Sequence, residues 1–170
     1  MNVDKPGVGF NDPTPATPVG GNNAPTLGGQ RLAAVQAAAE KWQSLLDTNV
    51  DVVINVTFAS VAQPACTASG GVLAQAYPIS WAHSFAGAPR ENVWYPIALA
   101  NKLAGTDLEP GRPDIFVQFN LDIDDSVCFG DTGFYYGLDG QHGSDVDLYV
   151  VALHEIAHGL GVASAERAPT

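Results

Sequence analysis

The chain has 170 residues, of which 46% are hydrophobic and 15% are charged, a composition typical of a folded domain. Its formal net charge of −11 disfavours nucleic acid and anionic membrane surfaces as partners, because like charges repel. The seven Lys and Arg residues are spread along the sequence and form no basic patch. No apolar run reaches the roughly 18 residues of a membrane span, so none is predicted.

Residues 1–29 are predicted to form an extended lead-in, ahead of one domain at 30–170. Apolar residues within it leave room for the lead-in to lie along the domain surface. The first residues lack the basic and apolar stretches of a signal peptide. Regular helix and long strands are excluded by two glycine pairs and by five prolines: Pro6, Pro13, Pro15, Pro18 and Pro25.

Hydrophobic spacing predicts a core-packing helix followed by strands. Apolar residues recur every three or four positions over Gln30–Asp47, which indicates a helix. Asp51–Ser60 alternates between apolar and polar residues, as a half-buried strand does. Residues 61–95 are predicted to be loops with short strands at Val72–Tyr77 and Ile79–His83.

The second half of the chain is predicted to contain two more helices and one more strand. Pro96 and Gly105 bracket a short helix at Ile97–Ala104. Asp114–Asn120 alternates as a strand. The last helix is predicted to end at Leu160 and to begin at Ser144 or Asp145, either of which is a suitable N-cap. This order of elements predicts an α+β fold, with the last helix packed under a mixed sheet.

Cys66 and Cys128 are the only cysteines, and neither belongs to a Cys-x-x-Cys pair. A disulfide between them would stabilise the fold by roughly 4 kcal/mol in the chain-entropy model. Two unrelated buried thiols are the alternative. A disulfide favours an extracellular location, and we therefore expect a mature or excised secreted segment with an added Met1.

The C-terminal helix contains the string His154-Glu155-Ile156-Ala157-His158, followed by Gly159-Leu160-Gly161. Histidines four residues apart share one face of a helix, so both imidazoles can bind a common zinc ion. Glu155 is then placed to activate zinc-bound water. The alternative is an ordinary helix with two surface histidines, but the apolar residues before His154 indicate a buried helix. The sequence therefore predicts a zinc site.

With these residues, the chain resembles the N-terminal part of a zincin metallopeptidase catalytic domain, and it is similar to secreted bacterial peptidases that carry HEIAHGLG or HEFAHGLG. The spacing from His154 to Gly161 matches the start of the longer metzincin signature. Proteins of that group often carry a protease-associated domain. Three further segments resemble them: Gly9–Asp12, Trp94–Gly105 and Phe134–Gly140.

The resemblance implies a zincin-like fold and zinc-dependent hydrolysis of a protein or peptide substrate. Zinc held by His154 and His158 would acidify bound water, and Glu155 would move the proton to the leaving amine. The Asp114–Asn120 strand is a candidate edge for pairing with an extended substrate, and an ordinary sheet strand is the alternative.

The sequence does not identify the third zinc ligand. Ser164 stands where a metzincin has His or Asp, and serine is a poor zinc ligand. Glu166 and a residue beyond Thr170 are the other candidates. If the ligand lies beyond Thr170, we expect the chain to be a peptidase domain truncated at its C-terminus. Acidic loop residues are candidate calcium ligands, although their spacing matches no EF-hand. The alternative is that they are ordinary solvated carboxylates. They are Asp122, Asp124, Asp125, Asp139, Asp145 and Asp147.

Two other function classes remain open: a non-catalytic zinc-binding module, and a pseudo-peptidase or truncated product that hydrolyses nothing. The sequence carries no signal for substrate preference or for oligomeric state.

Overall fold

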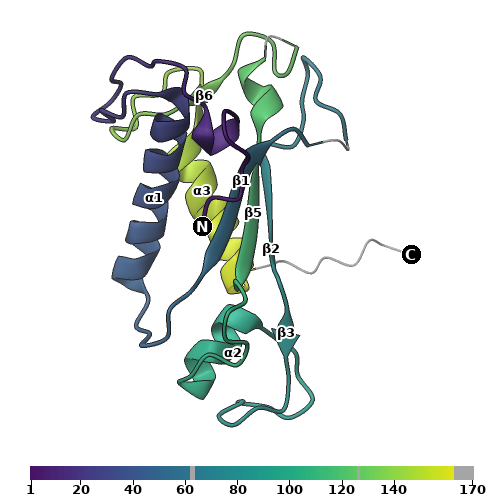
Figure 1. The fold of residues 1–170 in the computed structure, drawn as a ribbon. Helices are drawn as coiled ribbons and strands as arrows, with labels where there is room; N and C mark the ends of the chain where they lie inside the picture. The colour runs from purple at the N-terminus through teal and green to yellow at the C-terminus, as the bar shows by residue number, and fades with distance from the viewer. Residues whose placement is uncertain (62–63, 126, 163–170) are drawn as a thin grey trace.

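The computed structural model describes residues 1–61, 64–125 and 127–162. Over these residues the fold is α+β, with three α-helices and small sheets (Figure 1). Helices α1 (Leu27–Leu45) and α3 (Leu148–Leu160) pack against each other, and α3 lies against the main sheet. Within the described residues, no helix has both the length and the apolar character needed to cross a bilayer.

The main sheet has the strand order β1 (Ile54–Ala59), β5 (Ile115–Asn120), β2 (Ala74–Pro78). Strand β5 is parallel to β1 and antiparallel to β2. The predicted role of Asp114–Asn120 as a substrate-pairing edge is therefore wrong, because β5 is paired on both sides. The two edge strands are β1, which meets the lead-in through an isolated bridge between Val56 and Asn2, and β2, which the sequence predicted as Val72–Tyr77.

Side-chain alternation in β5 places the core on the helix-bearing face of the sheet. Ile115, Val117 and Phe119 are fully buried, while Phe116 and Gln118 lie on the other face, beside Tyr77 and Gln75 of β2. A side chain at Gly159 of α3 would overlap Ile115, so this glycine lets the helix approach the sheet closely.

Each helix begins or ends at a residue suited to that position. The hydroxyl of Thr26 accepts the N–H of Gly29 at the start of α1. Helix α2 (Ile97–Ala104), as predicted, ends at Gly105 in the left-handed conformation. The N-cap of α3 is Asp147, which accepts the N–H of Val150. The predicted N-cap at Ser144 or Asp145 is wrong, because the short strand β7 (Val146–Asp147) pairs with β6 (Phe134–Tyr135) before the helix begins.

The lead-in packs onto the domain and reaches its core. The N–H of Val56 in β1 donates to Met1, and the N–H of Val3 donates back to Val56. A short 3-10 helix, η1 (Gly9–Asn11), then buries Phe10 against the rings of Phe58 and Phe119.

Arg31 of α1 is the buried cation that joins these segments. Its guanidinium donates to the carbonyl of Gly9 at 3.0 Å, to Asp124 at 2.9 Å and to the Tyr136 hydroxyl at 3.1 Å. It also lies 4.5 Å from the centre of the Phe58 ring. Burial lowers the pKa of Arg31, but Tyr136 and Asp124 outweigh that effect and the net pKa is raised.

Replacing Arg31 with Met is expected to lower the free energy of unfolding by about 2–4 kcal/mol, because the charge of Asp124 loses its ion-pair partner and the Gly9 carbonyl loses a donor. The exposed Arg112, which pairs with Glu109, is the matched control. Its replacement with Met should cost less than about 1 kcal/mol. Urea unfolding of both variants measures the difference, and equal losses would contradict the role given to Arg31.

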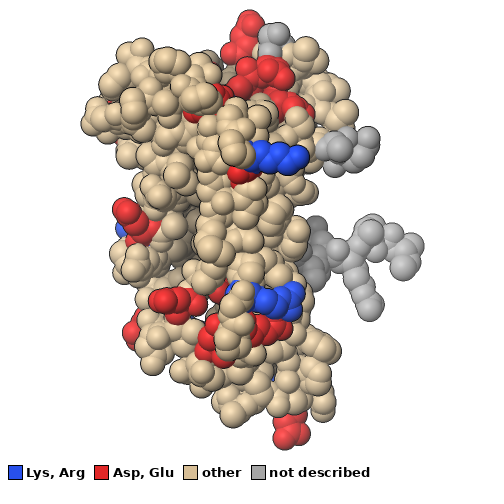
Figure 2. Space-filling view, in the orientation of Figure 1, with Lys and Arg blue, Asp and Glu red and all other residues tan. Residues whose placement is uncertain are grey.

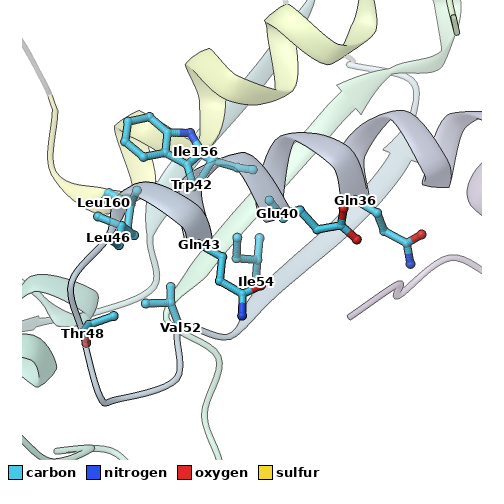
Figure 3. A pocket seen from close by; sticks show the side chains of 11 residues that line it. Gln36, Glu40, Trp42, Gln43, Leu46, Thr48, Val52, Ile54, Ile156 and Leu160 are labelled. Carbon is cyan, nitrogen blue, oxygen red and sulfur yellow. The ribbon is translucent and has the colours of Figure 1, made fainter. Parts of the chain in front are cut away.

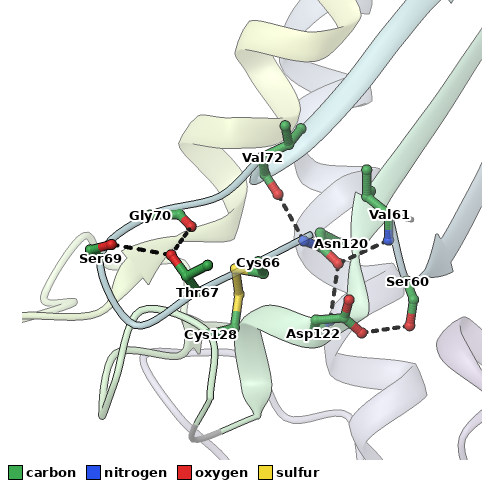
Figure 4. Close-up of a disulfide and its surroundings, with 10 residues drawn as sticks. All are labelled: Ser60, Val61, Cys66, Thr67, Ser69, Gly70, Val72, Asn120, Asp122 and Cys128. Carbon is green, nitrogen blue, oxygen red and sulfur yellow. Dashed lines mark hydrogen bonds between the residues drawn. A yellow bond between two sulfur atoms is a disulfide. The ribbon is translucent and has the colours of Figure 1, made fainter. Parts of the chain in front are cut away.

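The predicted disulfide between Cys66 and Cys128 is present, with Cα atoms 5.1 Å apart (Figure 4). It joins the loop before β2 to the loop after the 3-10 helix η2 (Leu121–Asp124). Buried Asn120 braces the same region: its side chain accepts the N–H of Val61 and donates to Val72.

Replacing both cysteines with Ala is expected to lower the free energy of unfolding by about 4 kcal/mol, because the disulfide closes a long loop in the unfolded chain. Chemical denaturation with and without a reducing agent measures this. The double variant should be insensitive to the reductant. A wild-type chain equally insensitive to reduction would rule out the stabilising role.

Candidate metal centre

The two histidines of the HExxH string converge at the C-terminal end of α3. Their Nε2 atoms lie 2.9 Å apart, and their rings are perpendicular with centres separated by 4.5 Å. His154 is exposed and His158 is half-buried, whereas Ile156 between them faces the core. The helix therefore presents both imidazoles together on its outer side.

The turn that ends α3 fixes the orientation of His158. Gly161 adopts a left-handed conformation, with φ of 107°, and its N–H donates to the carbonyl of His158. The chain then turns back, and Nδ1 of His158 lies 2.7 Å from the carbonyl oxygen of Val162. Because a carbonyl only accepts, Nδ1 carries the proton and Nε2 keeps its lone pair for a ligand.

Glu155 lies on the adjoining, buried side of the helix and is 7% exposed. Burial raises the pKa of its carboxyl group, and the nearby His154 and His158 partly oppose this rise. A carboxylate with a raised pKa beside two imidazoles is suited to accepting a proton.

The His154–His158 pair fits a tetrahedral metal ion with nitrogen ligands. Two such nitrogens at about 2.0–2.1 Å from zinc lie about 3.3 Å apart, so the rings need to open by only about 0.4 Å. Over the described ranges, no group of three His, Cys, Asp or Glu residues gathers around a common point. Ser164 and Glu166, two of the predicted third ligands, lie outside the described residues.

The other histidines stand apart from this pair. His83 packs edge-on against Trp94 and contacts the Ser84 hydroxyl. Nδ1 of His142 lies 2.7 Å from the carbonyl of Asp145, in the loop that precedes β7.

The acidic residues considered for calcium make separate local contacts. Asp122 accepts the hydroxyl of Ser60, Asp139 accepts that of Tyr135, and Asp147 caps α3. Asp124 is engaged by Arg31. On the face in Figure 2, acidic side chains outnumber basic ones and form separate patches with uncharged surface between them.

A groove of about 480 Å³ lies elsewhere, between α1 and β1 (Figure 3). Its apolar wall includes Trp42, Ile54 and Ile156. Neither metal-site histidine nor Glu155 lines it, because Ile156 and Leu160 turn a different side of α3 toward the groove.

Sequence reasoning missed two parts of the site. One is the carbonyl of Val162, for which Gly161 is the only sequence signal, since a glycine at that position allows the reversing turn. The other is the position of β2 at an edge of the sheet, because periodicity does not reveal strand order.

Comparisons with known proteins place the chain among proteins other than the peptidases it resembles. A family profile described as SPBPB7E8-like matches residues 23–167. An uncharacterized protein of Schizosaccharomyces pombe (strain 972) is 28% identical over 148 residues, which cover 83% of this chain and 24% of that protein. The chain thus spans about a quarter of the length of this relative. No solved structure matches the chain.

The predicted membership in a zincin peptidase family, close to secreted HEIAHGLG-type peptidases, is therefore wrong. The resemblance depended on one short helical string and three short segments. An HExxH string reports a local arrangement of two imidazoles and a carboxylate, and such arrangements recur in unrelated families.

In the metal-free protein, neutral His158 is expected to be protonated on Nδ1, because Val162 accepts that proton. Neutral His154 is expected to be protonated on Nε2, which then donates to Nε2 of His158. Long-range ¹H–¹⁵N correlation spectra distinguish the two tautomers. A proton on Nε2 of His158 would contradict the orientation described above.

Proposed function

The chain belongs to the SPBPB7E8-like family, and we propose that it is a zinc-dependent peptidase domain. His154 and His158 hold the metal, and Glu155 is the general base. The observation that carries this proposal is the approach of the two Nε2 atoms to 2.9 Å on the outer side of α3, beside a buried carboxyl group. Imidazole nitrogens are suitable zinc ligands.

A zincin-like arrangement is part of the same proposal. Its support is the position of the HExxH helix under a mixed sheet, next to an edge strand that runs antiparallel to its neighbour. A helix placed in this way faces a strand edge that an extended peptide could pair with.

The protein's own residues supply positioning and proton transfer. When bound, zinc supplies Lewis acidity for water and for the scissile carbonyl. Val162 orients His158 through Nδ1, so that Nε2 stays a ligand. Glu155 takes a proton from the attacking water and returns it to the leaving amine nitrogen as the peptide C–N bond breaks.

Non-catalytic zinc binding is the second candidate function. One observation favours it: among the described residues, only two of the three ligands that a catalytic zinc site requires come together. Under the peptidase proposal, a further side chain, with Ser164, Glu166 and a residue beyond Thr170 as candidates, completes the site.

We also propose an extracellular location. The disulfide between Cys66 and Cys128 supports it, because disulfides persist in oxidising compartments.

Replacing Glu155 with Gln is expected to leave zinc binding intact and to reduce hydrolysis of casein by at least about 100-fold, because the amide cannot accept the proton. Zinc content by elemental analysis and casein hydrolysis test this. Replacing the exposed Glu40 of α1 with Gln is the matched control and should change neither property.

The histidine variants separate the two candidate functions. Replacing His154 or His158 with Ala should remove the bound zinc, whereas the same change at His142 should retain it. Zinc that depends on the pair without any hydrolysis dependent on Glu155 would establish the non-catalytic alternative. Zinc retained by both histidine variants would contradict both candidate functions.

A further inference from the structure

An aromatic surface lies on the ribbon formed by β3 (Trp81–Ala82) and β4 (Tyr95–Pro96). Trp81 and Trp94 are 50% and 59% exposed, and the centre of the His83 ring lies 4.1 Å from that of Trp94. Trp81 pairs directly with Pro96 in the register. His83 and Trp94 lie just outside the two strands, and continuing the register by one step pairs them, in agreement with their ring contact. Since residues two apart along an extended chain share a face, this register places Trp81 on the same side as that pair.

The ribbon follows directly from the edge strand and adjoins the metal-site helix. Strand β2 continues through Ser80 into β3, and the N–H of Ile97 donates to the carbonyl of Ser80. A Cβ built on Gly161 would lie only 3.0 Å from Pro96. The β3–β4 ribbon therefore lies beyond one end of β2 (Figure 1), and its residue Pro96 lies next to the turn that positions His158.

The free edge of β2 carries main-chain groups available for pairing. The carbonyl of Leu73 accepts the N–H of Asn120, and the N–H of Ile79 donates to Asp114. In an antiparallel pair every second residue bonds to its partner, so the odd-numbered residues of this segment point their main-chain groups toward β5. By that alternation, the N–H and C=O groups of Ala74 and Ala76 point away from β5. Among the described residues, no strand pairs with this edge.

This edge lacks the charges that normally prevent strand pairing. Residues 52–89 contain no Asp, Glu, Lys or Arg, and neither do residues 93–101, in a chain whose net charge is −11. Exposed edge strands are usually protected by charged side chains, especially Lys. The carboxylate of Glu109 accepts the hydroxyl of Ser80 between β2 and β3, and its charge is balanced by the ion pair with Arg112. An edge with no charged side chains of its own therefore fits a neutral partner better than an ionic one.

We propose that the free edge of β2 and the aromatic surface together form a peptide track, which binds an extended, uncharged peptide with an aromatic side chain. The peptide pairs with the free edge of β2, and its aromatic ring stacks on Trp81 and Trp94. At about 3.3 Å per residue, the path from Ala76 to Trp81 is about 17 Å, the length of roughly six extended residues, so a seven-residue peptide covers it. The assignment of this peptide as a substrate rests on the proposed peptidase function, whereas its binding does not.

Calorimetric titration in EDTA with the Glu155→Gln chain measures binding without hydrolysis. The probe is a capped seven-residue peptide of Ser, Thr and Val with one central Phe. Matched probes carry Ala for Phe, two Glu for Ser, or N-methyl groups at alternate residues. We expect each matched probe to bind at least about threefold more weakly, because stacking, charge neutrality or main-chain pairing is lost.

The protein variants are Trp81→Ala and Trp94→Ala, each expected to weaken binding by about two- to tenfold. Trp81→Phe keeps a ring and should retain most of the affinity, and circular dichroism verifies folding. Leu45→Ala, at another exposed apolar residue, should bind as the parent does. Binding unaffected by the Trp changes or by N-methylation overturns the proposal, as does a dimer paired through β2 that excludes the peptide.

The outcomes also separate this proposal from the peptidase function. Trp-dependent binding without cleavage by the zinc-loaded wild-type chain supports the peptide track and rejects the peptidase. Glu155-dependent cleavage that is indifferent to Trp81 and Trp94 supports the peptidase and rejects the track.

Discussion

One buried guanidinium, that of Arg31, connects the parts of this fold that are far apart in sequence. It binds the lead-in through Gly9, the segment after β5 through Asp124, and the segment before α3 through Tyr136. Asp124 also accepts the N–H of Phe134, so the same cluster positions β6. Since β6 pairs with β7, and β7 leads directly into α3, the Arg31 cluster helps to determine where the metal-site helix begins.

The other end of α3 is positioned by small residues and by the indole of Trp42. Gly159 allows contact with Ile115 of β5, and the Trp42 indole donates to the carbonyl of Leu153. Gly161 then reverses the chain and brings Val162 to His158. Because these contacts fix the core-facing side of the helix, the imidazoles are left together on its outer side. The same close packing buries Glu155, and its raised pKa follows from that burial.

Local sequence patterns predicted the elements but not their assembly. The helix Ile97–Ala104 was predictable to its ends because Pro96 and Gly105 act locally. Strand order depends on contacts distant in sequence, so the sequence did not reveal that β5 is central and that β2 lies at an edge. Histidine spacing predicted the convergence of His154 and His158, since helical geometry requires it. The Val162 contact and the order Trp81, His83, Trp94 on one ribbon face arise only from the folded chain. The family comparison shows the limit of a short motif: it indicates a possible ligand pair and not the lineage.

A crystal structure of the zinc-loaded protein would show directly whether the histidine pair of α3 is a metal site. We expect one zinc ion within about 2.0–2.1 Å of Nε2 of both His154 and His158, with Nδ1 of His158 still hydrogen-bonded to the carbonyl of Val162. Zinc bound elsewhere, with the two Nε2 atoms still hydrogen-bonded to each other, would contradict it.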